Sequence, residues 1–354
     1  MGETHILHAM RPEDLLTPTP AGVCCRRAGF HIDPTRPVDK AIITHGHSDH
    51  ARAGHRHVLA TPETLAIMAL RYGENFAGST QAIRYGESIT LDGVTVSCHP
   101  AGHVLGSAQI AVAHKDMKIV ASGDYKNVPD PTCTPFELVP CDVFITEATF
   151  GLPVFRHGDP DAEIGKLLHS IELFPERAHL VGAYSLGKAQ RVIALIRKAG
   201  FDKPVYLHGA MEKVTRFYER SGINLGELRA VSGAKKADLA GTVTLCPPSA
   251  LKEVWSRRFP DPVSSFASGW MRVRARARQA HAELPLVISD HADWDGLTAT
   301  IVATGASEIW VTHGQEDALV HWCQQHGLKA RPLDIVGYGD EEDDAPTADE
   351  SGPQ

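Results

Sequence analysis

Aromatic residues make up only 6% of this chain of 354 residues, and long apolar runs are missing. No stretch approaches the roughly 18 consecutive apolar residues that a membrane-spanning helix needs. The opening residues MGETHILHAMRPEDLL lack both the basic and the apolar region of a secretory signal. These absences predict a cytoplasmic protein that has no membrane partner.

Paired cysteines are missing as well. The seven cysteines are scattered along the chain without a CxxC pair. An odd and unpaired set of this kind is typical of reduced thiols in a cytosol, and it argues against a disulfide framework.

A large charge excess is missing from the body of the chain, although the formal net charge is −8. The final stretch GDEEDDAPTADESGPQ carries seven acidic residues and no basic one, and we predict an acidic disordered tail over residues 338–354. Without those acids the net charge is −1. Residues 181–285 hold 18 Lys and Arg against 8 Asp and Glu, an excess of +10 that predicts a polyanionic partner.

The pattern of apolar residues predicts an α/β protein. Residues 40–125 have the pattern of strands joined by short loops, including a hairpin that turns at Asp92-Gly93. From residue 160 onward, predicted helices and strands alternate, and residues 284–314 return to strand, helix and strand. Such alternation is typical of helices that cover sheets.

Histidine is plentiful, with 20 residues, and ITHGHSDH places His45, His47, Asp49 and His50 within six positions. The spacing of His45 and His47 lets both imidazoles reach one ion from a loop. A single tetrahedral ion cannot use all four side chains and keep an open position for chemistry. We therefore predict two divalent metal ions, with Zn²⁺ favoured and Mn²⁺ as the alternative.

Further candidates lie where predicted strands end, because a rigid sheet can aim side chains there at a shared crevice. These strand-end candidates are His45, Asp124, Glu147, His291 and His313. The loop HPAGHVLGSAQ adds His99 and His103 as possible ligands. Asp124 is suited to lie between two ions because each of its two oxygens can bind one.

Taken together, these motifs resemble one family. THGHSDH matches the HxHxDH signature of the metallo-β-lactamase superfamily, and PAGHVLGSA, SGDY, TEATFG, YSLGKAQ, SDHAD and THG follow in the order of its nucleic-acid-processing β-CASP branch. The resemblance covers about residues 15–336, and FGLPVFR and FASGWMR are most similar to bacterial ligase-associated DNA exonucleases. It implies an αβ/βα sandwich with an inserted β-CASP-type α/β cap domain.

The resemblance also implies a division of the chain. Residues 1–164 would form the first part of the metallo-β-lactamase domain, and residues 165–284 the β-CASP-like cap. Residues 285–337 would return to the first domain, ahead of the acidic tail.

Site residues carry over from the resemblance one by one. Seven match the ligands of two metal ions: His45, His47 and His103 on the first, Asp49, His50 and His313 on the second, and Asp124 bridging them. Asp33, in FHIDP, matches an aspartate that orients ligands from behind. Glu147 and His291 match the acid and the histidine of the β-CASP motifs.

The implied chemistry is hydrolysis of a phosphodiester by a hydroxide that bridges two metal ions. The catalytic candidates are Asp49, Glu147 and His291. His291 is our candidate general acid because a carboxylate partner keeps an imidazole protonated near neutral pH. The alternative for the pair is a hydrogen bond that only orients a ligand or a phosphate.

Two stretches in the predicted cap are candidates for contacts to nucleic acid. In YSLGKAQ, Ser185 and Lys188 lie at a predicted helix start, where free amides attract anions. In FASGWMRVRARARQ, a small-residue loop of Ser268 and Gly269 precedes four arginines. These are Arg272, Arg274, Arg276 and Arg278, which would share one face if the run were extended. With so few aromatic residues, extensive base stacking is not expected, and packing is favoured for Trp270 and Trp294.

The leading functional hypothesis is a DNA exonuclease in DNA repair, with DNA as its partner and a functional association with a DNA ligase and a helicase implied by the resemblance. An RNA-processing β-CASP ribonuclease is the alternative, because a histidine at His313 is more usual in RNA-cleaving members. A small-molecule metallo-hydrolase and a non-catalytic nucleic-acid-binding subunit rank lower. The basic cap argues against the small-molecule hydrolase, and the full set of seven ligands argues against the non-catalytic subunit.

Overall fold

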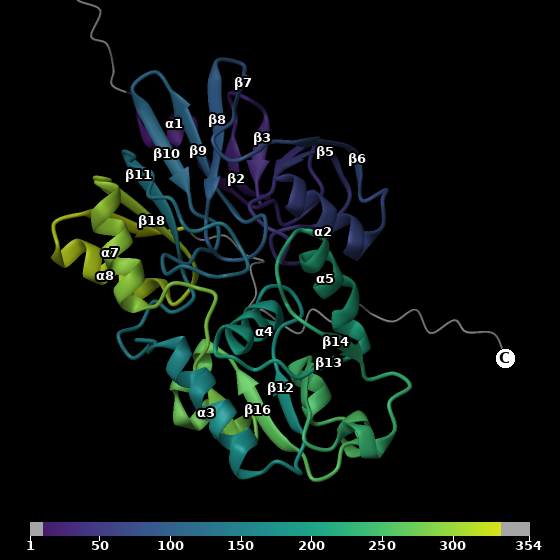
Figure 1. Cartoon of the computed structure of the whole chain (residues 1–354). Helices are drawn as coiled ribbons and strands as arrows, with labels where there is room; N and C mark the ends of the chain where they lie inside the picture. The colour runs from purple at the N-terminus through teal and green to yellow at the C-terminus, as the bar shows by residue number, and fades with distance from the viewer. Residues whose placement is uncertain (1–9, 334–354) are drawn as a thin grey trace, which may run out of the picture.

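Two β-sheets pack face to face in the upper part of Figure 1, and a third sheet with its helices forms the lower part. The computed structural model describes residues 10–333, so the tail predicted over 338–354 lies outside the described residues. Within that span, no helix is long and apolar enough to cross a membrane.

The first sheet has six strands in sequential order. They are β1 (Thr17–Thr19), β2 (Gly22–Cys25), β3 (Phe30–Ile32), β4 (Lys40–Ile42), β5 (His55–Ala60) and β6 (Ala77–Ala82). Helix α1 (Pro12–Leu15) precedes it, and α2 (Pro62–Tyr72) follows β5. Helix α2 begins at Pro62, because proline suits the first helical position and the Thr61 hydroxyl accepts a hydrogen bond from the Thr64 amide.

The second sheet has seven strands in the order β19-β18-β11-β10-β9-β8-β7. Their bounds are β7 (Ser88–Leu91), β8 (Val94–Pro100), β9 (Ala108–His114), β10 (Met117–Ala121), β11 (Val143–Ala148), β18 (Glu308–Gly314) and β19 (Lys329–Pro332). The hairpin of β7 and β8 turns at Asp92 and Gly93, which both have positive φ, as expected of a two-residue hairpin turn.

The faces of these two sheets enclose one apolar core, to which Phe30, Ile42, Ile110 and Ile145 contribute. Helices α7 (Trp294–Thr304) and α8 (Glu316–Gln325) cover the outer face of the second sheet through a separate cluster. The buried Met68 of α2 packs against the outer face of the first sheet. The layers are therefore helix, sheet, sheet and helix, which confirms the αβ/βα sandwich.

The third sheet is parallel throughout and has the order β14-β13-β15-β12-β16-β17. Its strands are β12 (His179–Gly182), β13 (Val205–Leu207), β14 (Leu228–Ala230), β15 (Val243–Cys246), β16 (Val263–Ala267) and β17 (Leu284–Leu286). Its α-helices are α3 (Pro160–Leu173), α4 (Lys188–Lys198), α5 (Gly209–Arg220) and α6 (Arg274–Gln279). Short 3-10 turns η1 (Lys236–Leu239), η2 (Pro248–Leu251), η3 (Val254–Arg258) and η4 (Gly269–Arg272) complete it.

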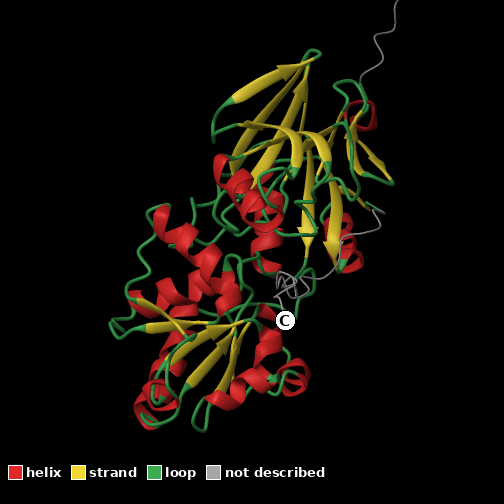
Figure 2. Cartoon of the chain, turned by 90° about the vertical axis from the view of Figure 1, so that its right-hand side faces the viewer, coloured by secondary structure: helices red, strands yellow, loops and turns green. Residues whose placement is uncertain are grey.

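This third sheet is an insertion between two neighbouring strands of the second sheet. Strands β11 and β18 pair in parallel with Val143 opposite Glu308, although β12 to β17 lie between them in the sequence. Figure 2 shows the inserted sheet and its helices below the two upper sheets. The limits 1–164, 165–284 and 285–337 stay a prediction.

The extended conformation considered for the arginine run is wrong. Residues 269–272 form η4, and residues 274–279 form α6. Alternate residues of a helix point in widely different directions, so the four guanidinium groups do not share one face. Arg and Ala favour helix, and Ala277 is buried, which explains why this short segment is helical.

Candidate metal centre

The histidine-rich loop directly follows β4, and the other predicted ligands meet it from the second sheet. Strands β10, β11 and β18 are mutually parallel, so their carboxyl ends lie at one edge. Asp124 follows β10 there, and His313 lies near the end of β18. His103 comes from the loop that joins β8 to β9. The prediction that the candidates lie where strands end fits this arrangement, although Glu147 and His313 are the penultimate residues of their strands and do not follow them.

Three imidazole nitrogens converge at the centre of this edge. His45 Nε2 lies 3.1 Å from His47 Nδ1, and His103 Nε2 lies 3.0 Å from the same atom. Asp124 Oδ2 lies 3.5 Å from His45 Nε2 and 3.9 Å from His103 Nε2. These four buried side chains form a group that could hold a metal ion. Tetrahedral zinc with Zn–N bonds of about 2.0–2.1 Å separates its ligand nitrogens by roughly 3.3 Å, close to the spacing observed.

Backbone carbonyls decide which nitrogens carry protons. His47 Nε2 lies 3.2 Å from the Leu186 carbonyl oxygen, and His103 Nδ1 lies 3.0 Å from that of Asp290. Because a carbonyl only accepts, each of these nitrogens must donate, and the neutral ring then has a lone pair on its other nitrogen. Burial lowers the pKa of His103 to about 3, which keeps the ring neutral. Lone pairs facing each other at 3.0 Å in a buried site repel each other, and a metal ion bound by both relieves that repulsion, so these residues fit a metal ion.

His50 forms the second part of the cluster. Its Nδ1 donates to Asp33 Oδ2 over 2.8 Å, which turns Nε2 towards Asp124 Oδ2 at 3.3 Å and Asp49 Oδ2 at 3.6 Å. The His313 ring stacks on the His50 ring with centroids 4.6 Å apart. Asp124 Oδ2 thus faces His45 on one side and His50 on the other, while Asp124 Oδ1 is buried without a hydrogen-bond partner. That position suits a bridging carboxylate, and the ligand roles stay a prediction.

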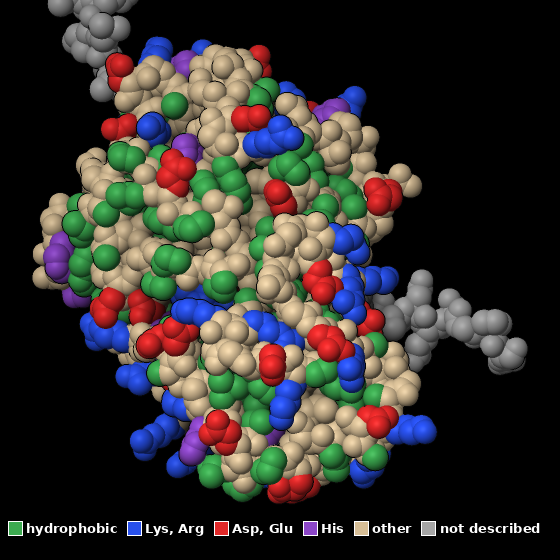
Figure 3. Space-filling view, viewed as in Figure 1, with side chains coloured by type: hydrophobic (Ala, Val, Ile, Leu, Met, Phe, Trp, Pro, Cys, Tyr) green, Lys and Arg blue, Asp and Glu red, His purple; other side chains and the backbone are tan. Residues whose placement is uncertain are grey.

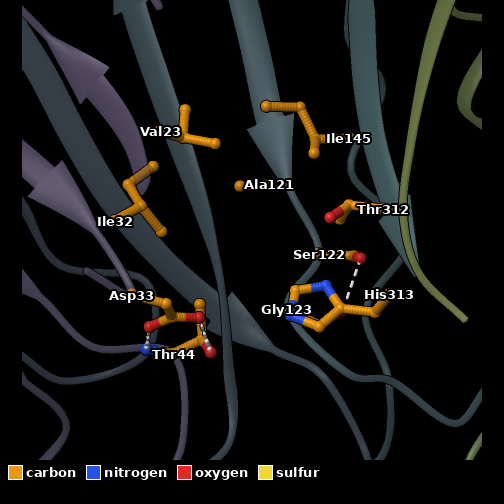
Figure 4. Close-up of a pocket in the computed structure, with 10 residues that line it drawn as sticks. All are labelled: Val23, Ile32, Asp33, Thr44, Ala121, Ser122, Gly123, Ile145, Thr312 and His313. Carbon is orange, nitrogen blue, oxygen red and sulfur yellow. Dashed lines mark hydrogen bonds between the residues drawn. The ribbon is translucent and has the colours of Figure 1, made fainter. Parts of the chain in front are cut away.

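Asp33 supports the histidine loop from below. Its carboxylate accepts hydrogen bonds from the Thr44 amide at 2.8 Å and the Thr44 hydroxyl at 2.6 Å, as well as from His50. Figure 4 shows Asp33, Thr44 and His313 at one end of a cavity of about 30 Å³ between the two upper sheets. Its other end is lined by apolar side chains such as Val23 and Ile145. A cavity of this size has room for about one water molecule. Asp33 and His50 are 4% and 0% exposed, so the pair is shielded from bulk solvent.

Glu147 and His291 form a buried pair beside the three histidines. His291 Nδ1 lies 2.8 Å from Glu147 Oε2, and the Tyr125 amide donates to Glu147 Oε1 over 2.6 Å. The His291 ring lies 4.5 Å from that of His103, measured between centroids. Asp124, Glu147 and His291 are close enough to hold an ion themselves, so the geometry allows His291 to act either as an acid or as a ligand.

Two charged residues near His291 were not expected from the sequence. Asp290 lies next to it in the chain, and Asp290 Oδ1 is 2.5 Å from Lys188 Nζ in a fully buried ion pair. Lys126 Nζ donates to the His291 carbonyl over 3.2 Å, and burial lowers the pKa of Lys126 to about 7. Asp290 lies inside the quoted motif SDHAD and Lys126 directly follows SGDY, so their positions next to these motifs were the available signal. His99 lies apart from the cluster and pairs with Glu137 at 2.9 Å.

The predicted contacts to nucleic acid are of two kinds. Ser185, Lys188, Ser268 and Gly269 are all buried. Lys188 is paired with Asp290, and the Ser268 hydroxyl accepts from the Trp270 amide at 3.3 Å. Arg272 and Arg274 are exposed. Their roles in binding stay predictions. Figure 3 shows Lys and Arg side chains gathered mainly over the lower half of this face and along its junction with the upper half.

The layered fold and the His/Asp cluster define a metallo-β-lactamase-type protein with an inserted parallel α/β unit. No family model matches the chain. A probable DNA ligase of Opitutus terrae is 28% identical over 317 residues, which cover 87% of this chain and 30% of that protein. Endoribonuclease YSH1 of Gibberella zeae is 28% identical over 188 residues, covering 50% of this chain and 22% of the relative.

An uncharacterised protein in the lig 3′ region of Acidianus ambivalens is 30% identical over 147 residues, covering 40% of this chain and 99% of that protein. A crystal structure of a protein of unknown function from Enterococcus faecalis has the same fold, with a TM-score of 0.56 and 13% identity over 85% of this chain and 80% of the other. The chain belongs to the β-CASP branch of the metallo-β-lactamase superfamily. It spans less than a third of the ligase and of the endoribonuclease.

Proposed function

We propose that this chain is a metal-dependent phosphodiesterase, and specifically a DNA exonuclease that acts in DNA repair. The observation that carries the proposal is the pair of histidine nitrogens, His47 Nδ1 and His103 Nε2, held 3.0 Å apart with their protons on the opposite sides of the rings. A metal ion bound by both nitrogens satisfies that arrangement, and the buried Glu147–His291 pair beside it supplies a proton-transfer group.

Two divalent ions, Zn²⁺ or alternatively Mn²⁺, would be held by residues already close together. The first would take His45, His47 and His103, the second Asp49, His50 and His313, and Asp124 would serve both. Bound there, the ions would supply the Lewis acidity that lowers the pKa of a water molecule and neutralises charge on the phosphoryl oxygens.

The protein's own residues orient the proton donor. Glu147 Oε2 accepts from His291 Nδ1, which leaves His291 Nε2 on the side of the ring that can carry a proton to the leaving oxygen. The Tyr125 amide holds the second Glu147 oxygen, and Lys126 holds the His291 carbonyl. With both partners fixed, the imidazole keeps one orientation when the phosphate arrives.

The substrate assignment is supported by two kinds of observation. Residues 181–285, which include most of the third sheet, have a charge excess of +10 that suits a phosphate backbone. DNA is favoured because similarity to the probable DNA ligase covers 87% of the chain, and a second relative is named for the lig 3′ region. A functional association with a DNA ligase, and with a helicase, belongs to the same proposal, as does a cytoplasmic location.

A second candidate is an RNA-processing ribonuclease, which the similarity to endoribonuclease YSH1 over half of the chain favours. Single- and double-stranded DNA and RNA, labelled at the 5′ or the 3′ end, separate the two. We expect stepwise shortening of DNA that requires Zn²⁺ or Mn²⁺, stops with a chelator and is absent in Asp124→Asn. Faster cleavage of matched RNA would overturn the DNA assignment, and no metal-dependent cleavage of either would overturn the phosphodiesterase.

A further inference from the structure

A groove lies on the third sheet at some distance from the histidine cluster. It consists of two adjoining hollows of about 350 and 180 Å³, which share Lys252, Phe266 and Ala280 in their walls. Tyr184, Trp270 and Arg276 line the larger hollow. We call the two hollows, bounded by these six residues, the side groove.

The topology explains why a groove forms here. Phe266 lies in β16, Tyr184 follows β12, and Lys252 follows η2, the turn after β15. These three strands are neighbours in the parallel sheet. The three residues thus lie at or beyond the carboxyl ends of neighbouring parallel strands, and open α/β sheets bind their ligands outside such ends.

The lining of the side groove combines flat rings with positive charge. The Arg276 guanidinium lies 3.9 Å from the centre of the Trp270 ring, and Tyr184 and Phe266 meet edge to face at 6.4 Å. Lys252 and Arg276 are exposed cations, and none of the described lining residues is acidic. Aromatic faces beside unopposed cations are suited to a nucleobase with its phosphate. The larger hollow has the volume of a small-molecule pocket.

A chain of ring contacts joins the side groove to the candidate metal centre. Trp270 lies 4.8 Å from Phe150, and Phe150 lies 6.0 Å from His291, measured between ring centroids. Trp270, in the wall of the side groove, is therefore connected to the proposed proton donor His291 through Phe150 alone. A strand whose end lies at the histidines could have another of its nucleotides in the groove.

We propose that the side groove binds one nucleotide of the substrate strand, away from the bond that is cleaved. The base lies between Phe266 and the Trp270–Arg276 stack, and Lys252 faces an adjoining phosphate. This inference rests on the proposed nuclease function and names a position on its substrate. It departs from the expectation that packing is the role of Trp270, because folding gathers three aromatic residues, Trp270 among them, in one groove.

The test is a scan with single abasic sites. A fluorescent ten-nucleotide DNA strand with phosphorothioate linkages, which resist hydrolysis, is titrated with the full chain and followed by anisotropy. In the wild type, removing the base at one position should weaken binding about tenfold. Phe266→Leu and Arg276→Gln should bind the intact strand more weakly and show less than a twofold effect at that position.

Arg220→Gln is the matched control, because Arg220 is an exposed arginine at the end of α5, and that end lies towards the amino edge of the sheet. It should keep the full abasic effect. An equal effect at every position of the wild-type scan, or a retained effect in both groove variants, would overturn the inference. Arg276 is exposed, so its variant keeps the test decisive if Phe266→Leu fails to fold.

A substrate without a base separates this inference from the function on which it rests. Wild-type hydrolysis of bis(p-nitrophenyl) phosphate with Zn²⁺ or Mn²⁺ reports on the metal centre alone. If the wild type hydrolyses this substrate but removal of the base has the same effect at every position of the strand, only the side-groove inference is overturned. If the abasic effect depends on position but the chain shows no metal-dependent hydrolysis, the side-groove inference is kept and the proposed nuclease function is overturned. If the strand does not bind at all, the side-groove inference is overturned.

Discussion

Lys188→Met should be among the most damaging substitutions outside the histidine cluster. Lys188 in α4 pairs with Asp290 at 2.5 Å, and both side chains are at most 2% exposed. The substitution leaves the Asp290 carboxylate buried without its cation, which typically costs about 3–5 kcal/mol of unfolding free energy. Replacing both partners by apolar residues is often close to neutral. The double variant Lys188→Met/Asp290→Leu should therefore recover most of that loss.

Metal binding supplies the second measurement. The Asp290 carbonyl accepts the proton of His103 Nδ1, so a displaced Asp290 releases the ring that faces the cluster. Loss of such a supporting contact lowers metal affinity about 10- to 100-fold. We expect Lys188→Met to show this drop in a titration against a chromogenic chelator.

Urea unfolding of the metal-free protein, followed by circular dichroism, measures the stability. Lys198→Met is the matched control because Lys198 lies on the same helix and forms an exposed pair with Asp161 at 2.6 Å. That variant should lose no more than about 1 kcal/mol. If Lys188→Met loses no more than about 1 kcal/mol of unfolding free energy, the reasoning is refuted. It is also refuted if the double variant loses as much as Lys188→Met and Asp290→Leu lose separately, added together.

Four further outcomes are expected. Gly187→Ala should lower both the melting temperature and the metal content, because Gly187 has a φ of +83° and a Cβ there would clash with Val104 Cγ1. An unchanged metal content after dialysis would contradict this. His291→Ala should abolish turnover while elemental analysis finds wild-type metal, and loss of one metal would make His291 a ligand and exclude the acid role. Replacing Arg272 and Arg274 by Gln should reduce the salt dependence of DNA binding by about two in the log–log slope, and an unchanged slope would show that these exposed arginines contact no phosphate. Burial raises the pKa of Glu308, but hydrogen bonds from Lys329 and Trp310 outweigh it and leave the pKa below its ordinary value; the stability this provides is present above the unfolded-state pKa and is lost as pH falls through the folded one. Lys329→Met should therefore reduce the difference in unfolding free energy between neutral and acidic pH. An unaltered difference would show that the Glu308–Lys329 pair does not contribute this stability.

The sequence was most informative where chemistry resides in side chains close together in the chain. The spacing in HGHSDH predicted a compact cluster, and the strand preceding it predicted where that cluster would lie. The arginine run shows the limit of such patterns, because the same residues suit an extended or a helical segment. In the folded chain the segment is helical, and the helix buries Ala277.

Backbone acceptors could not be predicted in the same way. The carbonyls of Leu186 and Asp290 orient His47 and His103, yet a carbonyl has no signature among residue types. The contacts also join residues 139 and 187 positions apart, far beyond the reach of local periodicity. The side groove was missed for a related reason, because Tyr184 follows β12 whereas Phe266 and Trp270 lie at or just beyond the end of β16, far from Tyr184 in the sequence.

The two carbonyls connect the metal centre to the inserted sheet. Leu186 lies between β12 and α4, inside the inserted unit, and Asp290 follows β17, where the chain leaves that unit. The histidines themselves belong to the upper sheets. If the inserted unit moved away from the upper sheets, His47 and His103 would lose the contacts that fix their protons, and metal affinity would fall. The part of the molecule that contains the basic surface and the side groove therefore also helps to hold the candidate metal ligands in place.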